Sequence, residues 1–495
     1  MNVDVIVIGA GPAGLTLATE LALAGTRVVV VDRLAERSGQ SKAMNLQPRT
    51  AEVLDLRGLL PRADEHSIGR IEGHFSGIPL SYEGLDSRYP YQASIMQWRI
   101  EALLEERLTE LGGELRRGWD LTGLEQDEQG VTAYGPETLR ARYLVGCDGG
   151  RSTVRKLLGV EFTGVEATHY NTVADIVLGP GTADLPGGAT KIGEARRRRP
   201  DGSFASVVPL DEPGLYRFVY ADLRRERTEV TGEEIADTLR NFYGNEYELR
   251  EIRYASRFGD ATRQAEQYRT GRVFLAGDAA HIHPPIGGQG LNLGVQDAFN
   301  LGWKLAAVVA GRMPETLLDT YHAERHPVGA SVLDNVRAQS ALRTPGAEHR
   351  ALREIVTGLL DLPEANRAIA GMIAGLDIDY GGAGHTGTRL PDFRTGHRWA
   401  SELFHSGTGA LFTTDEKYLR PAEPWTDRVA AVHVDRLPWP DVEAVLVRPD
   451  GYVCWTTGHE PMTTSLRAWF GDPGHETADV PPLAESRRST PKGTQ

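Results

Sequence analysis

The chain has 495 residues, of which 40% are hydrophobic and 25% are charged. This composition is typical of a globular protein, and the length predicts two or three domains. The formal net charge of −14 argues against nucleic acid or an anionic membrane surface as the main partner. No stretch approaches the ~18 uncharged apolar residues of a membrane helix.

Cysteine usage and the N-terminus indicate the cellular setting. Cys147 and Cys454 are the only cysteines, and neither has the spacing of a metal or redox motif. This usage is typical of a reducing cytoplasm without a disulfide framework. The first apolar run lacks a basic segment before it, so we interpret it as a strand and not as a signal peptide. The sequence therefore predicts a cytoplasmic protein.

A glycine-rich turn ends the first apolar run. Gly9, Gly11 and Gly14 form a GxGxxG motif between that run and a helical pattern. In such a turn the first glycine makes the tight bend, the second lets the backbone approach a pyrophosphate, and the third lets the helix pack on the strand. The first amides of the helix then face the phosphates. The next strand, residues 27–31, leads to Asp32, which can accept a hydrogen bond from a ribose hydroxyl.

Helical and strand-like patterns alternate through the middle of the chain. Helices are predicted over 49–55 and 99–111, and strands over 130–134 and 143–145. A stripe of apolar residues predicts a further helix over 290–309. This alternation is typical of an α/β fold.

Two acidic motifs follow predicted strands. Asp148 comes soon after the strand at 143–145, and we expect it to fix the turn there, with Arg155 as a candidate partner. Asp278 ends another apolar run, where it could accept hydrogen bonds from the ribityl hydroxyls of a flavin or cap a helix. The helix that begins near Gly290 would aim its amides at the pyrimidine edge of the flavin, which becomes anionic on reduction. Together with the glycine turn, these motifs predict a flavin site.

Three segments have a functional interpretation and a simpler one. His322 and His326 are spaced as on one helix face, but no third metal ligand is evident and Pro327 follows, so we interpret them as surface histidines near a helix end. The basic run 196–199 could bind anions, but a Pro-Asp-Gly turn follows it, and we interpret it as part of a solvated hairpin. A second GxGxxG at 382–387 follows no buried strand, and we interpret it as a linker between domains.

Three stretches carry a resemblance to a known family. They are residues 49–54, 143–150 and 277–292. With the glycine turn, they resemble the FAD-dependent aromatic hydroxylases, which are class A flavoprotein monooxygenases with the p-hydroxybenzoate hydroxylase fold. The chain is most similar to the aromatic polyketide-tailoring branch of that family. The resemblance is strong over residues 1–390 and looser beyond them.

The resemblance implies an α/β fold with three domains. A Rossmann-like FAD-binding domain would be discontinuous, and a mixed-sheet substrate domain would be inserted into it. A thioredoxin-like C-terminal domain would follow, and without a CxxC motif it would have no thiol–disulfide chemistry. The expected boundaries are 1–69, 96–174 and 269–390 for the FAD-binding domain, 70–95 and 175–268 for the substrate domain, 391–485 for the thioredoxin-like domain and 486–495 for a disordered tail.

The resemblance also implies a set of FAD contacts, although the flavin itself carries the chemistry and we predict no catalytic residue and no metal ligand. Asp32 replaces the glutamate usual in the family. Lys42 stands where relatives often have arginine, so it would offer the flavin a single positive charge and not the paired donors of a guanidinium group. For Arg33, Gln97 and Leu121 an ordinary surface or core role is an equal alternative. The predicted contacts are Gly9, Gly11, Ala13, Gly14, Asp32, Arg33, Lys42, Gln97, Leu121, Asp148, Asp278, Pro285, Gly290, Leu291 and Asn292.

The function implied is that of a monooxygenase that uses O2, NAD(P)H and non-covalently bound FAD. It would hydroxylate a polycyclic aromatic, polyketide-type substrate through a C4a-hydroperoxyflavin, in antibiotic or secondary-metabolite biosynthesis. NADPH or NADH would be a transient co-substrate. A Baeyer–Villiger or ring-opening oxygenation is the alternative within the family. A non-catalytic protein that binds FAD or an aromatic metabolite is the alternative of another class.

Overall fold

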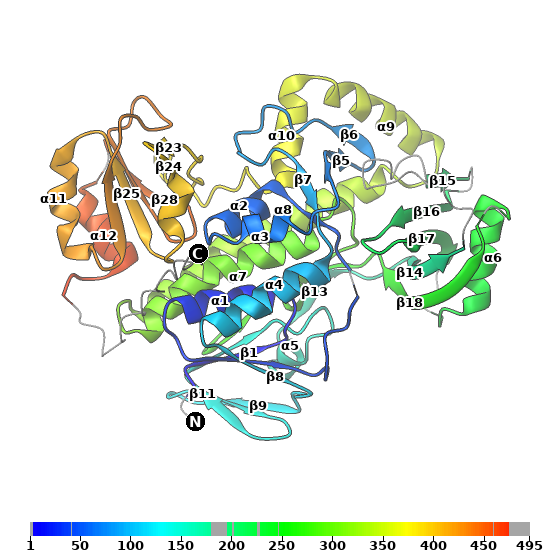
Figure 1. Cartoon of the computed structure of the whole chain (residues 1–495), viewed down its shortest axis with the longest axis horizontal. Helices are drawn as coiled ribbons and strands as arrows, with labels where there is room; N and C mark the ends of the chain where they lie inside the picture. The colour runs from blue at the N-terminus through cyan, green and yellow to red at the C-terminus, as the bar shows by residue number, and fades with distance from the viewer. Residues whose placement is uncertain are drawn as a thin grey trace, which may run out of the picture.

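The computed structural model describes residues 3–40, 42–179, 196–199, 202–224, 228–245, 247–458 and 460–474. Three sheet-containing regions lie side by side (Figure 1). A parallel sheet and its helices occupy the centre, a five-stranded sheet lies on one side, and the C-terminal sheet lies on the other. The tail predicted over 486–495 lies outside the described residues.

The central sheet has six strands in the order β20-β21-β12-β1-β2-β8, and all of them except the edge strand β20 run parallel. Valine and isoleucine dominate β1 and β2 and are buried, as expected where both faces of a parallel sheet are covered. This arrangement confirms the predicted α/β class and its Rossmann-like region. The strands are β1 (Val5–Ile8), β2 (Val28–Asp32), β8 (Glu114–Arg117), β12 (Tyr143–Gly146), β20 (Arg269–Thr270) and β21 (Val273–Leu275).

Helices cover one side of this sheet, where α1 contacts both α4 and α7 (Figure 1). A three-stranded antiparallel sheet lies on the opposite side, and its inward residues join the same apolar core. The helices predicted over 49–55, 99–111 and 290–309 are confirmed to within two residues at each end. These elements are α1 (Pro12–Leu23), α2 (Pro48–Asp55), α3 (Leu60–Asp64), α4 (Gln97–Glu110), α5 (Thr153–Leu157), α7 (Gly290–Val309), β9 (Gly123–Gln126), β10 (Val131–Tyr134) and β11 (Leu139–Ala141).

Small sheets connect the centre to its neighbours. The orders are β3-β7-β4, β5-β6 and β13-β19-β22. The strands within 70–95 thus pair with one another and with β3, and none of them joins the five-stranded sheet. The strands are β3 (Asn45–Leu46), β4 (Arg70–Ile71), β5 (Gly73–Phe75), β6 (Ile78–Leu80), β7 (Gln92–Ser94), β13 (Phe162–Val165), β19 (Thr262–Ala265) and β22 (His281–Ile282).

The five-stranded sheet is antiparallel, with the order β15-β16-β17-β14-β18. Alternate residues of β14 and β17 are buried beneath the amphipathic helix α6, which accounts for the alternating sequence pattern. Its elements are β14 (Tyr170–Leu178), β15 (Arg196–Arg198), β16 (Phe204–Pro209), β17 (Leu215–Arg224), α6 (Gly232–Tyr243) and β18 (Leu249–Gly259).

His322 and His326 lie in the first turns of α8, near its N-terminal end, and are half-buried. The helix does not end at Pro327 but continues through it. Gln264 donates a hydrogen bond of 2.8 Å to the carbonyl of His326, and both histidine rings pack against Tyr268. Proline in a helix interior lacks the backbone N–H of one helical bond, and α8 nevertheless continues through it. No group of three residues suited to a metal ion occurs in the described part of the chain. The helices here are α8 (Asp319–Ala341), α9 (Ala347–Leu360) and α10 (Pro363–Ala374).

The C-terminal sheet has the order β26-β25-β27-β28, with β25 and β26 parallel and the other pairs antiparallel. Segment 382–387 forms turns and no helix, and its last residue donates from its backbone to Val453, as suits a linker. The described helices include none that is long and apolar enough to span a membrane. The elements of this region are β23 (Arg394–Thr395), β24 (Arg398–Trp399), β25 (Gly409–Thr413), α11 (Leu419–Ala422), β26 (Val429–His433), β27 (Ala444–Val447), β28 (Val453–Thr456) and α12 (Met462–Phe470).

Candidate cofactor site

The predicted acidic residues meet at one edge of the central sheet. Asp32 ends β2, Asp148 follows β12 and Asp278 follows β21. The glycine turn follows β1, which lies between β2 and β12. Because these strands are parallel, their carboxyl ends share one edge, which is where open α/β sheets bind ligands.

The three glycines of the turn have different surroundings. A Cβ atom on Gly9, whose φ is +107°, would lie 2.4 Å from the carbonyl oxygen of Cys147, and one on Gly14 would lie 2.0 Å from the carbonyl oxygen of Gly9. A Cβ on Gly11 would meet nothing within 4 Å. Two glycines are thus required by the protein's own packing, whereas Gly11 faces open space. The turn therefore provides a cradle that a pyrophosphate can enter.

The N-terminus of α1 opens onto this cradle. Gly11 is its N-cap residue, and no side chain caps the helix there. The first turn contains no acidic side chain, and Pro12 occupies the first helical position. The first amides are therefore available to an anion, with the positive end of the helix dipole behind them. This geometry fits the diphosphate of FAD.

Asp32 fixes the turn from the neighbouring strand. Its Oδ2 atom accepts a hydrogen bond of 2.7 Å from the backbone of Ala10, and its Oδ1 atom accepts one of 2.8 Å from the backbone of Leu34. Each carboxylate oxygen has two lone pairs, so both can still accept a bond from a ribose hydroxyl. Asp32 therefore holds the turn and keeps acceptor capacity on both carboxylate oxygens.

Asp278 is an exposed carboxylate at the start of the turn after β21. Its side chain makes no hydrogen bond or ion pair to any described residue. The preceding residue, Gly277, packs tightly: a Cβ there would lie 3.0 Å from the Cβ of Ala13 and 3.6 Å from the Cα of Gly294. The glycine brings the turn against α1 and α7 and leaves the carboxylate free, which suits a ligand contact better than a helix cap.

A buried ion network lies directly beneath Asp278. Asp297 on α7 accepts hydrogen bonds from Arg325 at 2.8 Å, from His281 at 2.6 Å and from the backbone of Gly277 at 3.2 Å. Burial alone would raise the pKa of Asp297, but the charges of Arg325 and His281 more than offset it and lower that pKa. The carboxylate therefore stays ionised and ties the turn to α7 and α8. Sequence reasoning missed this network, because its members are far apart in the chain.

Asp148 acts on its own turn. Its Oδ2 atom accepts bonds from the backbones of Thr153 and Val154, at 2.6 and 3.1 Å, while its Oδ1 atom is buried and has no partner among the described residues. The predicted pairing with Arg155 is wrong, because that guanidinium donates to the carbonyls of Ala279 and Gly150 at 2.7 and 2.9 Å. Arg155 thereby connects the turn after β12, which carries Asp148, to the segment after β21, which carries Asp278.

Hydrogen bonds with Asn45 and Gln47, in the segment before α2, hold the start of α7 in place. Asn292 accepts a bond from the backbone of Gln47 at 2.8 Å and donates to the carbonyls of Asn45 and Gly288. Gln47 donates to the carbonyl of Gly287 at 2.8 Å and is almost completely buried. Gln47 was not among the predicted site residues, since a single glutamine in a short strand-like segment has no distinctive pattern. These bonds shape the turn on which the helix amides are presented.

The remaining predicted contacts lie in varied surroundings. Leu121 is buried in the main apolar core, and Leu291 is half-buried between two cores. Gln97 accepts a bond from the backbone of Ala43 and donates to Glu101. The exposed residues among these contacts are Arg33, Lys42 and Pro285.

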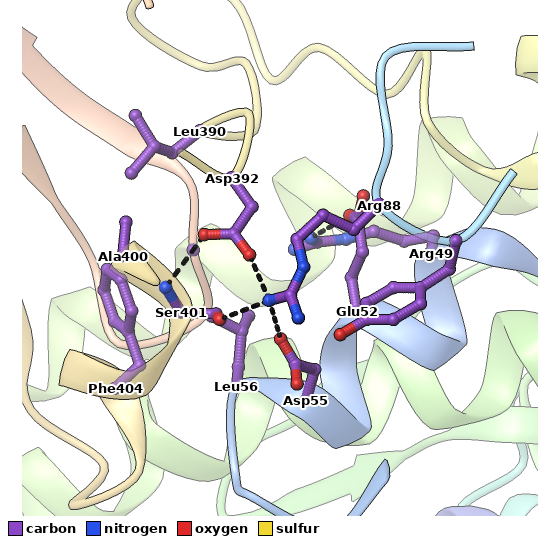
Figure 2. A pocket seen from close by; sticks show the side chains of 12 residues that line it. Arg49, Glu52, Asp55, Leu56, Arg88, Leu390, Asp392, Ala400, Ser401 and Phe404 are labelled. Atoms are coloured by element: carbon purple, nitrogen blue, oxygen red, sulfur yellow. Dashed lines mark hydrogen bonds and ion pairs between the residues drawn. The ribbon is translucent and has the colours of Figure 1, made fainter. Parts of the chain in front are cut away.

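A cavity of about 30 Å³ lies apart from this edge, between α2 and the C-terminal region (Figure 2). Arg88 points into it and bonds to Asp55, Asp392 and Ser401. A space of this volume holds about one water molecule. The charges around the cavity satisfy one another, so we assign it to the interface between regions and not to a ligand.

Comparisons with known proteins agree with this geometry. The FAD binding domain family matches residues 2–336, and the family named aromatic-ring hydroxylase, C-terminal, matches residues 383–473. The chain is 44% identical to the anhydrotetracycline monooxygenase of Streptomyces rimosus over 96% of this chain and 100% of that protein. It is 45% identical to a rifampicin monooxygenase of Streptomyces venezuelae over 94% of this chain and 98% of that one.

A solved structure is equally similar. OxyS anhydrotetracycline hydroxylase from Streptomyces rimosus matches with a TM-score of 0.87 at 44% identity, covering 96% of this chain and 100% of that one. The open cradle at Gly11, the uncapped helix and the free Asp278 carboxylate fit FAD as the cofactor. The chain belongs to the FAD-binding aromatic-ring hydroxylase family and is a flavin-dependent monooxygenase.

Proposed function

We propose that this monooxygenase hydroxylates a polycyclic aromatic, polyketide-type substrate in secondary metabolism, with NADPH or NADH as reductant. The observation that carries the proposal is its similarity, over nearly the whole of both chains, to an anhydrotetracycline monooxygenase. The similarity extends over the C-terminal region. That region contributes none of the proposed FAD contacts. A planar multi-ring ligand would bind mainly by apolar contact, between the central region and the five-stranded sheet.

The site geometry supports the following roles for individual residues. Gly9, Gly11 and Gly14 with the N-terminus of α1 would hold the pyrophosphate, and Asp32 would hold a ribose hydroxyl. Asp278 would accept hydrogen bonds from the ribityl chain. The first amides of α7, from Gly290 to Asn292, would stabilise negative charge on the reduced ring. We retain Ala13, Arg33, Lys42, Gln97, Leu121, Asp148 and Pro285 as further proposed contacts.

FAD, when bound, supplies the redox and oxygen chemistry. The protein would then position the substrate, present helix amides to the ring and keep water away. Gln47 and Asn292 would help to present the helix amides to the ring, since their bonds fix the turn that precedes α7.

Three further assignments belong to the proposal. The order and directions of β25 to β28, with helices α11 and α12, support a thioredoxin-like C-terminal domain without redox function. We keep the domain boundaries expected from the sequence as part of the proposal, although the strands within 70–95 pair with one another and with β3, and not with the five-stranded sheet. A cytoplasmic location is supported by two unpaired cysteines and by the need for NAD(P)H.

The test is a screen of FAD-loaded enzyme for substrate-stimulated NADPH oxidation, followed by product mass. Anhydrotetracycline and other tetracyclic phenols should accelerate oxidation and gain one oxygen atom, whereas p-hydroxybenzoate and phenol should have little effect. An opened or expanded ring would instead support the Baeyer–Villiger alternative. If no polycyclic phenol accelerates oxidation, the proposed substrate class is wrong. Mild denaturation should release intact FAD, which would show non-covalent binding.

A further inference from the structure

Four arginines from separate elements gather beside the five-stranded sheet. Arg196 and Arg198 lie on β15, Arg343 lies two residues after the end of α8, and Arg353 lies on α9. The guanidinium carbons of Arg196 and Arg343 lie 4.3 and 5.5 Å from the ring centroid of Phe204 on β16. Figure 1 shows β15 close to one end of α9. β15 and β16 pair antiparallel as expected for a hairpin, and residues 197–199 are exposed, but Arg196 is half-buried against Phe204.

No described carboxylate pairs with these four side chains. The Nε atom of Arg196 is buried and has no hydrogen-bond partner among the described residues. Burial, and then the charges of Arg343, Arg198 and Arg353, lower the pKa of Arg196 to about 9. Burial, Arg198 and Arg353 lower the pKa of Arg343 to about 10. Within the described part of the chain, the neighbouring positive charges therefore disfavour the charged forms of Arg196 and Arg343.

Elsewhere on the same sheet, buried arginines have acidic partners. Arg217 forms a two-pronged bond with Asp175 at 2.9 and 3.0 Å, and Arg257 pairs with Glu234. The chain as a whole carries an excess of acidic residues. Among the described residues this cluster has no acidic partner, unlike the other buried arginines of the sheet, and an anion bound there would relieve its repulsion.

Hydrogen bonds connect this cluster to the turn before α7. Arg353 donates to the carbonyl of Ser76 at 2.9 Å, and the backbone of Ser76 donates to Gln339 at 2.7 Å. Gln339 donates to Asn335 at 2.8 Å, and Asn335 also accepts a bond of 3.2 Å from Gln289, in the turn before α7. Ser76 has φ +55°, the only positive φ of a non-glycine residue in the described chain. Such a backbone is held only where its surroundings require it.

We propose that Arg196, Arg198, Arg343 and Arg353 form a binding site for an oxyanion carried by one of the enzyme's ligands. The substrate could supply it as an ionised phenol, enol or carboxylate oxygen, and the pyridine nucleotide could supply it as a phosphate. Planar guanidinium groups suit either, because they present paired donors to oxygen atoms. The arginine cluster lies beside the five-stranded sheet, and hydrogen bonds lead from it to the turn before α7. This position agrees with a ligand that lies between the five-stranded sheet and that turn. The substrate source rests on the function proposed above.

The test uses FAD-loaded enzyme and the variants Arg343→Gln and Arg196→Gln. Arg199→Gln is the matched control, because Arg199 belongs to the same basic run but bonds to the carbonyl of Asn241 at 2.7 Å. One arm measures the Kd of anhydrotetracycline, and another the KM values of NADPH and NADH. A third compares the rise in Tm with sodium sulfate and with sodium chloride at equal ionic strength, which needs no turnover.

In both cluster variants we expect one ligand to bind roughly 10- to 100-fold more weakly, the size of a lost charged hydrogen bond. Loss confined to anhydrotetracycline identifies the substrate as the source, and loss confined to NADPH identifies the nucleotide phosphate. Arg343→Lys should recover part of the affinity. The Tm of Arg343→Gln and Arg196→Gln should not fall, because each substitution removes a repelling charge, whereas loss of a structural arginine would lower the Tm.

The sulfate arm separates this proposal from the proposed function. A sulfate-specific rise in Tm that is present in the native enzyme and in Arg199→Gln, but reduced in Arg343→Gln, supports the site even if no polycyclic phenol is turned over. Equal sulfate responses together with affinities within twofold of the native enzyme would overturn it. Equal losses in Arg199→Gln and Arg343→Gln would also overturn it, since they would show a general charge effect.

Discussion

The Nε2 atom of His281 lies 2.6 Å from the Oδ2 atom of Asp297, and both side chains are completely buried. The same carboxylate oxygen accepts the backbone hydrogen of Gly277, the residue before Asp278. The other oxygen accepts from Arg325 on α8. Asp297 thus holds in place the turn that presents the free carboxylate, without facing the ligand edge itself.

Replacing Asp297 with asparagine should destabilise the enzyme strongly. Arg325 would be left as a buried charge without its partner, and breaking a buried pair in this way costs about 3–5 kcal/mol. The turn at Gly277 would also lose one bond, so FAD should dissociate more readily. Thermal unfolding and flavin content of the purified protein measure both effects. The control is Asp334→Asn, which removes an exposed partner of Arg337 and should cost no more than about 1 kcal/mol.

Replacing Asp278 with alanine should weaken FAD binding without harming the fold. The carboxylate is exposed and makes no bond to the described protein, so only the ligand contact is lost. A hydrogen bond that involves a charged group contributes about 1.5–3 kcal/mol. FAD affinity measured by fluorescence on reconstitution tests this, with Asp361→Ala as an exposed control. Native affinity in a folded Asp278→Ala protein would remove Asp278 from the site.

Gly11 and Gly14 should respond differently to the same added methyl group. Gly11 has an ordinary φ of −83° and free space around its missing Cβ, so Gly11→Ala should fold normally and lose FAD affinity by roughly 1–3 kcal/mol. In Gly14→Ala the new Cβ would be forced against the carbonyl of Gly9, which should lower the free energy of unfolding by about 1–3 kcal/mol.

Unfolding of the two apoproteins in urea, followed by FAD titration, separates these effects. Equal FAD affinity of the native protein and Gly11→Ala would show that no pyrophosphate enters the cradle.

The pH dependence of stability should include a contribution from Lys304. Burial lowers its pKa to about 8 from an ordinary 10.5, although Glu324 lies 2.8 Å away. Between these values the unfolded chain binds more protons than the folded one, so the free energy of unfolding should rise with pH from about 8 to 10.5, by roughly 2–3 kcal/mol.

Urea unfolding at several pH values, compared between the native enzyme and Lys304→Met, isolates this rise. Lys156→Met, which removes an exposed lysine, should keep the native profile. Parallel profiles for the native enzyme and Lys304→Met would contradict the lowered pKa.

Replacing both cysteines with serine should leave turnover nearly unchanged. Burial raises the pKa of the Cys147 and Cys454 thiols, so neither forms the reactive thiolate readily. Substrate-dependent NADPH oxidation by the double variant measures this, with flavin content and Tm as checks on folding. A large loss of turnover in a folded, FAD-loaded double variant would show that a thiol takes part.

The sequence by itself determined the class of fold, the cofactor and the location of the main motifs. This was possible because the glycine turn and the acids at the ends of β2, β12 and β21 depend on local chain geometry. A strand followed by a turn and a helix leaves the same pattern wherever it occurs. The ends of α2, α4 and α7 followed from apolar periodicity for the same reason.

Only the tertiary structure decided which side chains meet across long stretches of chain. Asp297, His281 and Arg325 come from different elements, as do Arg196, Arg343 and Arg353, and no spacing rule connects them. α8 continues through Pro327, against the local preference of proline, and its neighbour His326 is packed against Gln264 and Tyr268. Pairing of charges and burial are properties of the folded surroundings, so the charge state of a residue such as Lys304 or Arg196 could not be inferred from its neighbours in sequence.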